Sequence, residues 1–251
     1  MRTFMKVASA VGALALLSLG SPAQAAVNLV TNGSFESSSY TRTTQFGAFF
    51  GGQGVTGWTG AGNKKLPWPL EFYFFGGTQT TVNALNQFGD PLAYFYDSFN
   101  TLSDDGGNFV GLDGDPMAAG LITQTINGLA IGQTYVLNFE YAASQLRNRK
   151  GATTEKLRVN FGSQTFDTAV LAVPSKGFSG WNDATFKFKA TSTSQVLSFL
   201  SIGTPAGLPP IALLDGVSLT AVPEPATWGL MILGFAGAGV MIRSRRRQLA
   251  V

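Results

Sequence analysis

Hydrophobic and polar residues alternate along several short stretches in the second half of the chain. Within residues 134–142, every second side chain is large and apolar: Tyr135, Leu137, Phe139 and Tyr141. A period of two predicts a strand with one buried face. This pattern, with Gly, Asn, Ser or Pro turns between the runs, predicts eight strands: 108–113, 121–126, 134–142, 157–161, 164–167, 183–190, 195–202 and 212–220.

The same pattern predicts the fold class. No stretch of the body shows a sustained helical period of 3.6, which favours an all-β, antiparallel two-sheet jelly-roll sandwich over an α/β fold. No repeat or long linker divides residues 26–221, so we predict one domain there. Residues 40–105 are rich in Gly and aromatic residues and have no clear period, so we expect an elaborated region with two or three strands.

Both ends of the chain differ from this body. Arg2 and Lys6 precede an apolar run at 7–19, and Ala23 and Ala25 form an A-x-A cleavage site. This order predicts a secretory signal peptide over residues 1–25, which signal peptidase removes.

The C-terminal segment, residues 222–251, has three parts. A Pro-Glu-Pro tripeptide comes first, in which two prolines favour an exposed, extended backbone. Residues 226–242 carry no charge and predict a short transmembrane helix. Four arginines follow within residues 243–247, and they are expected to stay on the cytoplasmic side of the membrane.

This order of parts resembles the PEP-CTERM sorting signal of Gram-negative bacteria in its PEPxxWA subtype, although Gly229 stands where that subtype usually has Ala. The residues that carry the resemblance are Pro223, Glu224, Pro225, Trp228, Arg243, Arg245, Arg246 and Arg247. The resemblance implies that an exosortase-type peptidase recognises the tripeptide while the chain is transiently anchored in the inner membrane. It then removes the helix and sends the body to the cell surface. A plain single-pass anchor is the alternative.

Charge and composition exclude several function classes. The net charge of +3 comes from the two ends, since residues 26–222 contain 11 basic and 13 acidic residues, a net charge of −2. Nucleic-acid binding therefore has no support in the body. Cysteine and histidine are absent, which excludes disulfides, histidine-ligated zinc and catalytic triads that use histidine.

The body contains three motifs of a known fold family. Residues 28–36 read N-L-V-x-N-G-S-F-E. Residues 124–139, which begin at Gln124, read Q-x-x-x-G-L-x-x-G-x-x-Y-x-L-x-F. Residues 214–219 read L-D-x-V-x-L. Together they resemble galactose-binding-like β-sandwich domains, including DUF642-type domains and several carbohydrate-binding modules. The resemblance implies a jelly roll and, in such modules, a non-catalytic role in binding polysaccharide.

Asp215 is the charged residue with the least expected position. Strand parity places it on the same face as Leu213, Val217 and Leu219, and a carboxylate on a core face is costly unless it is paired or binds a cation. The resemblance implies that a structural calcium ion is held by Glu36 and Asp215. The alternative is that Asp215 binds backbone amides at a bend and that Glu36 faces solvent; Asp113 is either a third ligand or part of a turn.

Aromatic residues are the candidates for binding a glycan, because sugar rings stack on Trp and Tyr. The candidates are Trp58, Trp68, Tyr73, Tyr94, Tyr96 and Trp181. For any one of them, burial in the core is the competing interpretation. Trp68, between Pro67 and Pro69, is the one that we expect to be most exposed.

No catalytic residue can be assigned from the sequence. A glycosidase needs two carboxyl groups about 5 to 9.5 Å apart, and nothing in the spacing selects a pair among Glu71, Asp97, Glu140 and Asp183. The sequence therefore predicts a non-enzymatic, exported surface or matrix protein that binds polysaccharide, in connection with exopolysaccharide or biofilm. The alternatives are a structural or adhesion protein without a glycan site and, last, a glycosidase that uses carboxylates alone.

Overall fold

The computed structural model describes two separate units of the chain. Residues 26–222 form one unit, and residues 1–25 together with 223–251 form the other. The described residues are 27–38, 55–61, 72–75, 95–96, 98–116, 119, 121–146, 149–207, 210–223, 229, 231–239 and 243. The predicted signal peptide, with Ala23 and Ala25, lies outside them.

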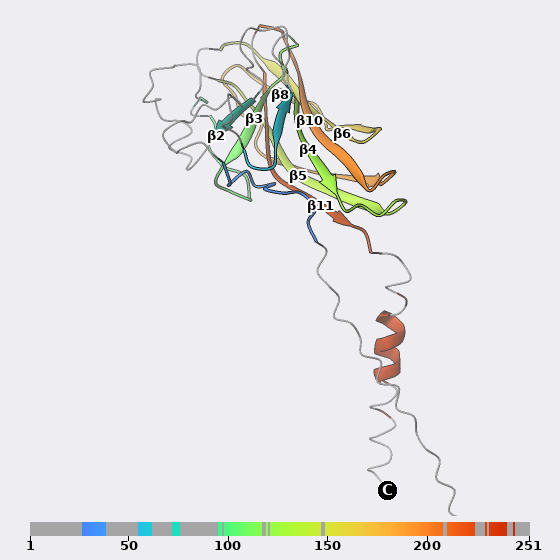
Figure 1. Ribbon diagram of the computed structural model, residues 1–251. Coiled ribbons are helices and arrows are strands. Elements are labelled where there is room, and N and C mark those ends of the chain that lie inside the picture. The colour runs from blue at the N-terminus through green and yellow to red at the C-terminus, as the bar shows by residue number, and fades with distance from the viewer. Residues whose placement is uncertain are drawn as a thin grey trace, which may run out of the picture. The chain divides into compact units, whose positions relative to one another are not determined.

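The larger unit is a sandwich of two antiparallel sheets (Figure 1). The first sheet has the order β1-β4-β10-β6-β7, and β8 also pairs with β6. Its strands are β1 (Thr59–Ala61), β4 (Leu121–Asn127), β6 (Thr153–Phe161), β7 (Gln164–Asp167), β8 (Leu171–Val173) and β10 (Ser194–Thr204). The second sheet has the order β2-β3-β11-β5-β9. Its strands are β2 (Phe72–Phe75), β3 (Phe109–Asp113), β5 (Thr134–Ser144), β9 (Asn182–Lys189) and β11 (Ile211–Ala221).

The predicted all-β, two-sheet antiparallel fold is confirmed, and each of the eight predicted strands corresponds to an observed one. Two strands, β1 and β2, lie in the aromatic-rich region, where two or three were expected. The hydrophobic pattern did not predict β8, which has only three residues.

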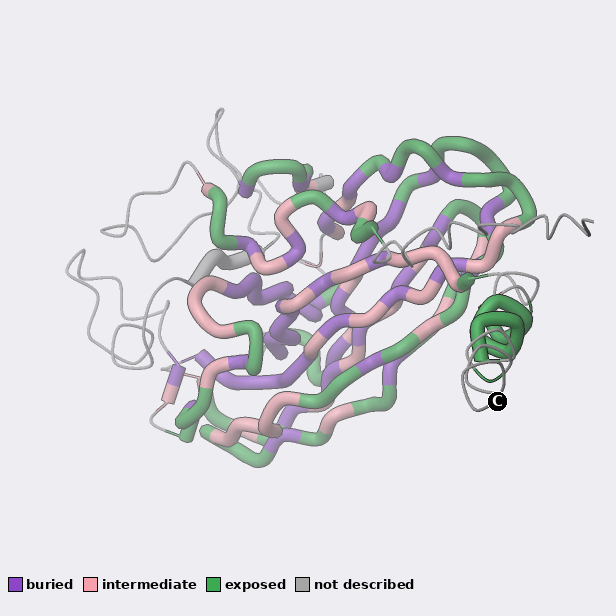
Figure 2. Tube along the Cα trace, turned by 90° about the horizontal axis from the view of Figure 1, so that it is seen from below, coloured by how far each residue is buried: buried purple, intermediate pink, exposed green. Residues whose placement is uncertain are grey.

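The main core lies between the two sheets. Buried and more exposed residues alternate along β5 and β6, and Figure 2 shows this as bands along the strands. The core contains Phe139 of β5 and Phe199 of β10, whose rings meet edge to face with centroids 5.1 Å apart. Such burial of large apolar side chains is the dominant stabilising contribution in a domain without disulfides.

A second apolar cluster covers the opposite face of the second sheet. It contains Phe95 and Phe99, which precede β3, together with Phe109 of β3. These three rings are fully buried, with centroids 5.0 to 6.3 Å apart. The second sheet is therefore packed on both faces, which explains why every residue of β3 is buried.

A bulge in β11 changes the expected position of Asp215. The pairing of β11 with β5 shifts register between Asp215 and Ser218, where Gly216 has a φ of +59°, a conformation that glycine adopts without strain. Val217 therefore returns to the main core, whereas Leu213 belongs to the second cluster. The expectation that Asp215 shares a face with Val217 and Leu219 is wrong, because the extra residue breaks the period of two.

The smaller unit contains the C-terminal helix. Residues 231–239 are helical, and all of them except Met231 are exposed. Within the described part of the chain, no helix is long and apolar enough to cross a membrane. The predicted transmembrane helix at 226–242 extends beyond the described residues at both ends, so it stays a prediction.

Candidate functional site

Asp215 is fully buried at the edge of the second cluster. Its carboxylate accepts hydrogen bonds from the Ser103 hydroxyl and from the amide of Gly216 at 2.8 Å. Burial raises the pKa of Asp215, its hydrogen bonds from Ser103 and Gly216 oppose the shift, and the nearby carboxylates of Asp105 and Glu140 add to it, so that the pKa is about 8.

Two more carboxylates bind the loop that begins at Ser103. Glu140 of β5 accepts hydrogen bonds from the amides of Asp104 at 2.7 Å and Asp105 at 3.1 Å. Glu36 accepts from the amide of Asn108 at 2.6 Å and from its side chain at 3.0 Å. Three carboxylates from distant parts of the chain therefore hold one loop, residues 103–108, against the second sheet.

The residues predicted to bind calcium both contact this loop. Asp183 of β9, Glu140 and Asp215 lie in one row across three strands, since each is in register with the next. This row supplies the negative charge that a hard cation requires. However, the described residues contain no group of three or more acidic side chains arranged to hold a metal ion. The site fits calcium in charge but not in arrangement, and the hydrogen bonds of Asp215 match the alternative interpretation, in which it binds backbone at a bend.

The candidate glycan-binding aromatics lie in different places. Trp58 is buried in the main core, where it packs between Phe35 and Phe199, so its ring offers no face to a sugar. Trp181 and Tyr96 are half-buried at the rim of the second cluster. Trp68 and Tyr94 lie outside the described residues, and so does the side chain of Tyr73, whose backbone is part of β2.

Trp181 and Tyr96 are both held by hydrogen bonds to backbone carbonyls. The Trp181 indole donates to the carbonyl of Thr101 at 3.1 Å and packs edge-on against Phe109. The Tyr96 hydroxyl donates to the carbonyl of Arg149 at 2.8 Å. Each ring is thus fixed in orientation while part of it stays accessible, as a stacking platform for a sugar requires.

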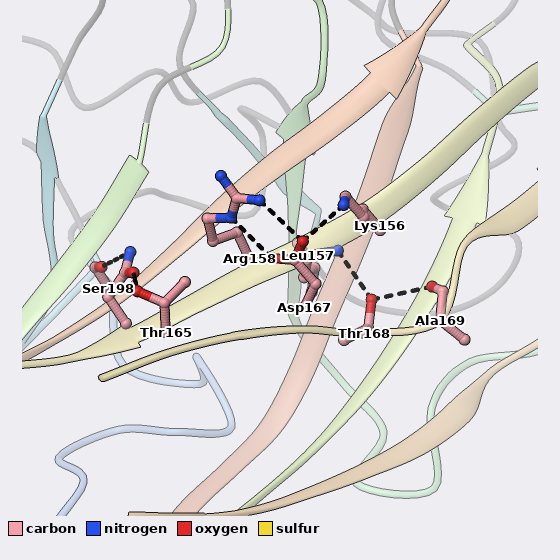
Figure 3. Close-up of polar contacts among 9 residues, drawn as sticks. Lys156, Leu157, Arg158, Thr165, Asp167, Thr168, Ala169 and Ser198 are labelled. Carbon is pink, nitrogen blue, oxygen red and sulfur yellow. Dashed lines mark hydrogen bonds and ion pairs between the residues drawn. The ribbon is translucent and has the colours of Figure 1, made fainter. Parts of the chain in front are cut away.

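The outward face of the first sheet is polar (Figure 3). Lys156 and Arg158 of β6 both bind Asp167 of β7, at 2.6 and 2.7 Å. Their hydrogen bonds and charges hold the pKa of Asp167 well below its usual range. Alternate residues of β6 point outward, so this ladder follows from the period-two pattern, but no sequence argument had singled it out.

Two further acidic side chains, Glu155 and Asp113, are buried in the fold. Glu155 of β6 is fully buried, and neither carboxylate oxygen has a hydrogen-bond partner among the described residues. Burial raises the pKa of Glu155 to about 8, and that of Asp113 in β3 to about 7. A signal for Glu155 was present in the sequence, since it shares the parity of the core residues Leu157 and Val159.

Of the carboxylates considered for catalysis, Glu140 and Asp183 are described. They face each other across β5 and β9, but both oxygens of Glu140 accept backbone amides, which favours a structural role. Glu71 and Asp97 lie outside the described residues.

The sorting-signal residues are described only in part. Pro223 and Arg243 are exposed. Glu224, Pro225, Trp228, Arg245, Arg246 and Arg247 lie outside the described residues.

Several solved structures are similar to this chain in fold alone. The TmCBM61 module, solved in complex with β-1,4-galactotriose, is 14% identical, with 78% of this chain and 99% of that chain covered and a TM-score of 0.43. The xylan-binding CBM22-1 domain of Xyn10C from Paenibacillus barcinonensis is 12% identical, with 81% and 99% covered and a TM-score of 0.42. An arabinose-bound α-L-arabinofuranosidase, MgGH51, is 13% identical, with 77% and 26% covered and a TM-score of 0.39.

Two family descriptions match parts of the chain. Residues 221–247 match the PEP-CTERM protein-sorting motif, and residues 103–217 match DUF642, a protein family of unknown function. No curated protein matches the chain. Both resemblances expected from the sequence are thereby confirmed as matches to parts of the chain: residues 103–217, within the β-sandwich, match DUF642, and residues 221–247 match the PEP-CTERM sorting motif.

Proposed function

We propose that this protein is exported, sorted to the cell surface or extracellular matrix, and binds polysaccharide there without catalysis. The observation that carries the proposal is the match of residues 221–247 to the PEP-CTERM sorting motif, which implies export and anchoring through the C-terminus. The finer steps are part of the proposal: signal peptidase removes residues 1–25, and an exosortase-type peptidase cleaves near Pro223, Glu224 and Pro225. We also propose a role in exopolysaccharide or biofilm, by analogy with other proteins that carry this class of signal.

A processing experiment tests the export step. The full chain is expressed in its own cells with Pro223, Glu224 and Pro225 replaced by Ala, and the membrane and surface fractions are compared by immunoblot. We expect the variant to accumulate uncleaved in the membrane, whereas wild type reaches the surface in a shorter form. Equal processing of both would show that the tripeptide is not recognised and would favour a plain anchor.

The half-buried rings of Tyr96 and Trp181 support the glycan-binding part, because both are oriented by hydrogen bonds and partly accessible. Purified residues 26–222, the unit that contains both apolar clusters, are titrated with polysaccharide extracted from the producing cells and with a panel of common glycans. Saturable binding is the expected result. A sample that melts cooperatively but binds none of them would instead support a structural or adhesive role.

A structural calcium ion at Glu36 and Asp215 is the one cofactor that we propose, because both residues bind loop 103–108 and Asp215 lies in register with Glu140. In that case, calcium raises the melting temperature of residues 26–222 and EGTA lowers it again, and Asp215→Asn removes this response. A melting temperature that EGTA leaves unchanged would end the calcium proposal and leave the hydrogen bonds to loop 103–108 as the role of both residues.

A further inference from the structure

Lys176 lies in the loop after β8 and has an unusual backbone conformation. Its φ of +64° is in the left-handed region, which is uncommon for a residue with a long side chain and costs free energy. Its amide donates to the side-chain oxygen of Gln145 at 2.6 Å, and its carbonyl accepts from the Ser98 hydroxyl at 2.5 Å. The exposed lysine is therefore held in a strained conformation by contacts on both sides of its Cα.

The support beneath Lys176 is rigid. Gln145 is fully buried and also donates to the carbonyl of Gly151 at 2.9 Å, while the amide of Gly151 donates to Ser175 at 2.9 Å. These bonds tie the loop after β5 to the loop after β8. A mobile surface lysine requires no such support, since its ammonium group is well solvated in many conformations.

The supported lysine lies beside a candidate stacking ring. The ammonium nitrogen of Lys176 is 5.6 Å from the centre of the Tyr96 ring, within the range of a cation–π contact. The hydroxyl of Tyr96 is in turn bound to the carbonyl of Arg149. One aromatic ring is thus fixed between a lysine and the backbone of an arginine.

Three described basic residues are linked to this ring by contact or by sequence. Arg149, whose backbone carbonyl accepts the hydrogen bond from Tyr96, is followed in the same loop by Lys150, and the ammonium group of Lys176 lies over the ring. Among the described residues, no ion pair is formed by Lys150 or Lys176. The buried Asp113 is the acidic group whose pKa Arg149 lowers. These three basic residues lie in a unit, residues 26–222, whose net charge is −2.

We propose that Tyr96, Lys176, Arg149 and Lys150 form a binding site for an acidic polysaccharide, in which a sugar ring stacks on Tyr96 and its carboxylate pairs with Lys176. This inference rests on the proposed function and names the substrate class: chains of uronic acid. Cations placed beside an aromatic ring select a sugar that presents an apolar face and an anionic group together. The pre-formed conformation of Lys176 lowers the entropy lost on binding.

The test compares polygalacturonate with the same polymer after full methyl esterification, which removes the charge and keeps the chain. Binding to residues 26–222 is measured by calorimetry, with dextran sulfate and the extracted cell polysaccharide as further arms. We expect polygalacturonate to bind at least tenfold more tightly than its ester and to weaken as salt is raised. Dextran sulfate binding as tightly as polygalacturonate would contradict selection of a carboxylate.

Lys176→Asn is the decisive variant, because it removes the ammonium group while Asn tolerates the positive φ of this position. Lys187→Asn, on the exposed side of β9, is the matched control. We expect Lys176→Asn to weaken polygalacturonate binding about tenfold and Lys187→Asn to change it less than twofold. Equal effects of the two variants, or equal binding of the acidic polymer and its ester, would overturn the inference while leaving glycan binding intact. Absence of binding to every polymer would overturn both this inference and the proposed glycan-binding function.

Discussion

The outward faces of the two sheets differ in chemistry. The first sheet presents short polar residues and the ion pairs of Lys156 and Arg158 with Asp167, and each of these side chains is matched by a neighbour on the same face. The second sheet is covered by the aromatic segment that contains Phe95 and Phe99, whose rim leaves Tyr96 half-exposed. A face whose polar groups bind one another has little to offer a ligand, whereas a rim with oriented rings and the exposed cations Lys150 and Lys176 offers a stacking surface and positive charge. We therefore place the function on the second face.

The largest expected effect is on stability and concerns the aromatic cover. Phe99→Ala removes a fully buried ring that contacts Phe95, Phe109 and Phe178, and we expect it to lower the free energy of unfolding by about 3–5 kcal/mol. Val196→Ala, at a half-exposed position of β10 on the polar face, is the control and should cost less than about 1 kcal/mol. Urea unfolding of both variants checks this. Similar losses of unfolding free energy in the two variants would show that the aromatic cover does not contribute to stability as a hydrophobic core does.

The next effect is pH-dependent and concerns Glu155. Its pKa rises from 4.5 in the unfolded chain to about 8 in the fold, so its contribution to stability is complete below pH 4.5 and is lost as the pH rises through 8. Each pKa unit corresponds to about 1.4 kcal/mol, and structural relaxation reduces the total, so we expect a loss of about 2 kcal/mol.

The comparison of wild type with Glu155→Gln isolates this contribution, because Asp113 and Asp215 titrate in a similar window in both proteins. Chemical unfolding at pH 5 and pH 9 should show a smaller decline in stability for the variant. Parallel declines in the two proteins would mean that Glu155 is not the buried acid that titrates.

A smaller effect separates the two faces in binding. Trp181→Ala removes a ring at the rim, and we expect it to weaken polysaccharide binding about tenfold, since stacking on one aromatic ring contributes roughly 0.5–1.5 kcal/mol beyond burial. Asn160→Ala on the polar face should leave binding unchanged within twofold. Calorimetric titration of both variants measures the two affinities. A larger loss of affinity for Asn160→Ala than for Trp181→Ala would place the binding site on the first sheet.

The smallest effect concerns the ion pairs of the polar face. Asp167→Asn breaks its contacts with Lys156 and Arg158, but exposed pairs of this kind contribute at most about 1 kcal/mol. We expect a small loss of stability that disappears at high salt, measured by thermal unfolding at two salt concentrations. A large loss that is insensitive to salt would show that this face is more than a solvated surface.

The strands could be predicted from the sequence, because apolar and polar residues alternate along a strand that has one buried and one exposed face. β6 alternates throughout and β5 alternates over its first seven residues, so both their existence and their inward faces were predicted correctly. The position of Asp215 could not be predicted, because parity holds only while every residue pairs, and the bulge at Gly216 adds one residue to β11.

The candidate site was predictable only as a set of residue types. Tyr96 and Trp181 were named from composition, but their accessibility depends on contacts with Arg149 and Thr101, which are far away in the sequence. Trp58 looked equivalent to them and is a core residue. The role of Lys176 had no sequence signal at all, since its left-handed conformation results from the distant side chains of Gln145 and Ser98.

Hydrogen exchange in the presence of polysaccharide tests the difference between the two faces most directly. Amide exchange of residues 26–222 is followed by mass spectrometry with and without a saturating amount of the extracted polymer. The account predicts added protection in the segments around Tyr96, Arg149 and Lys176 and none in the peptides that cover β6 and β7. Protection confined to β6, β7 and β10 would contradict it and place the binding surface on the polar face of the first sheet.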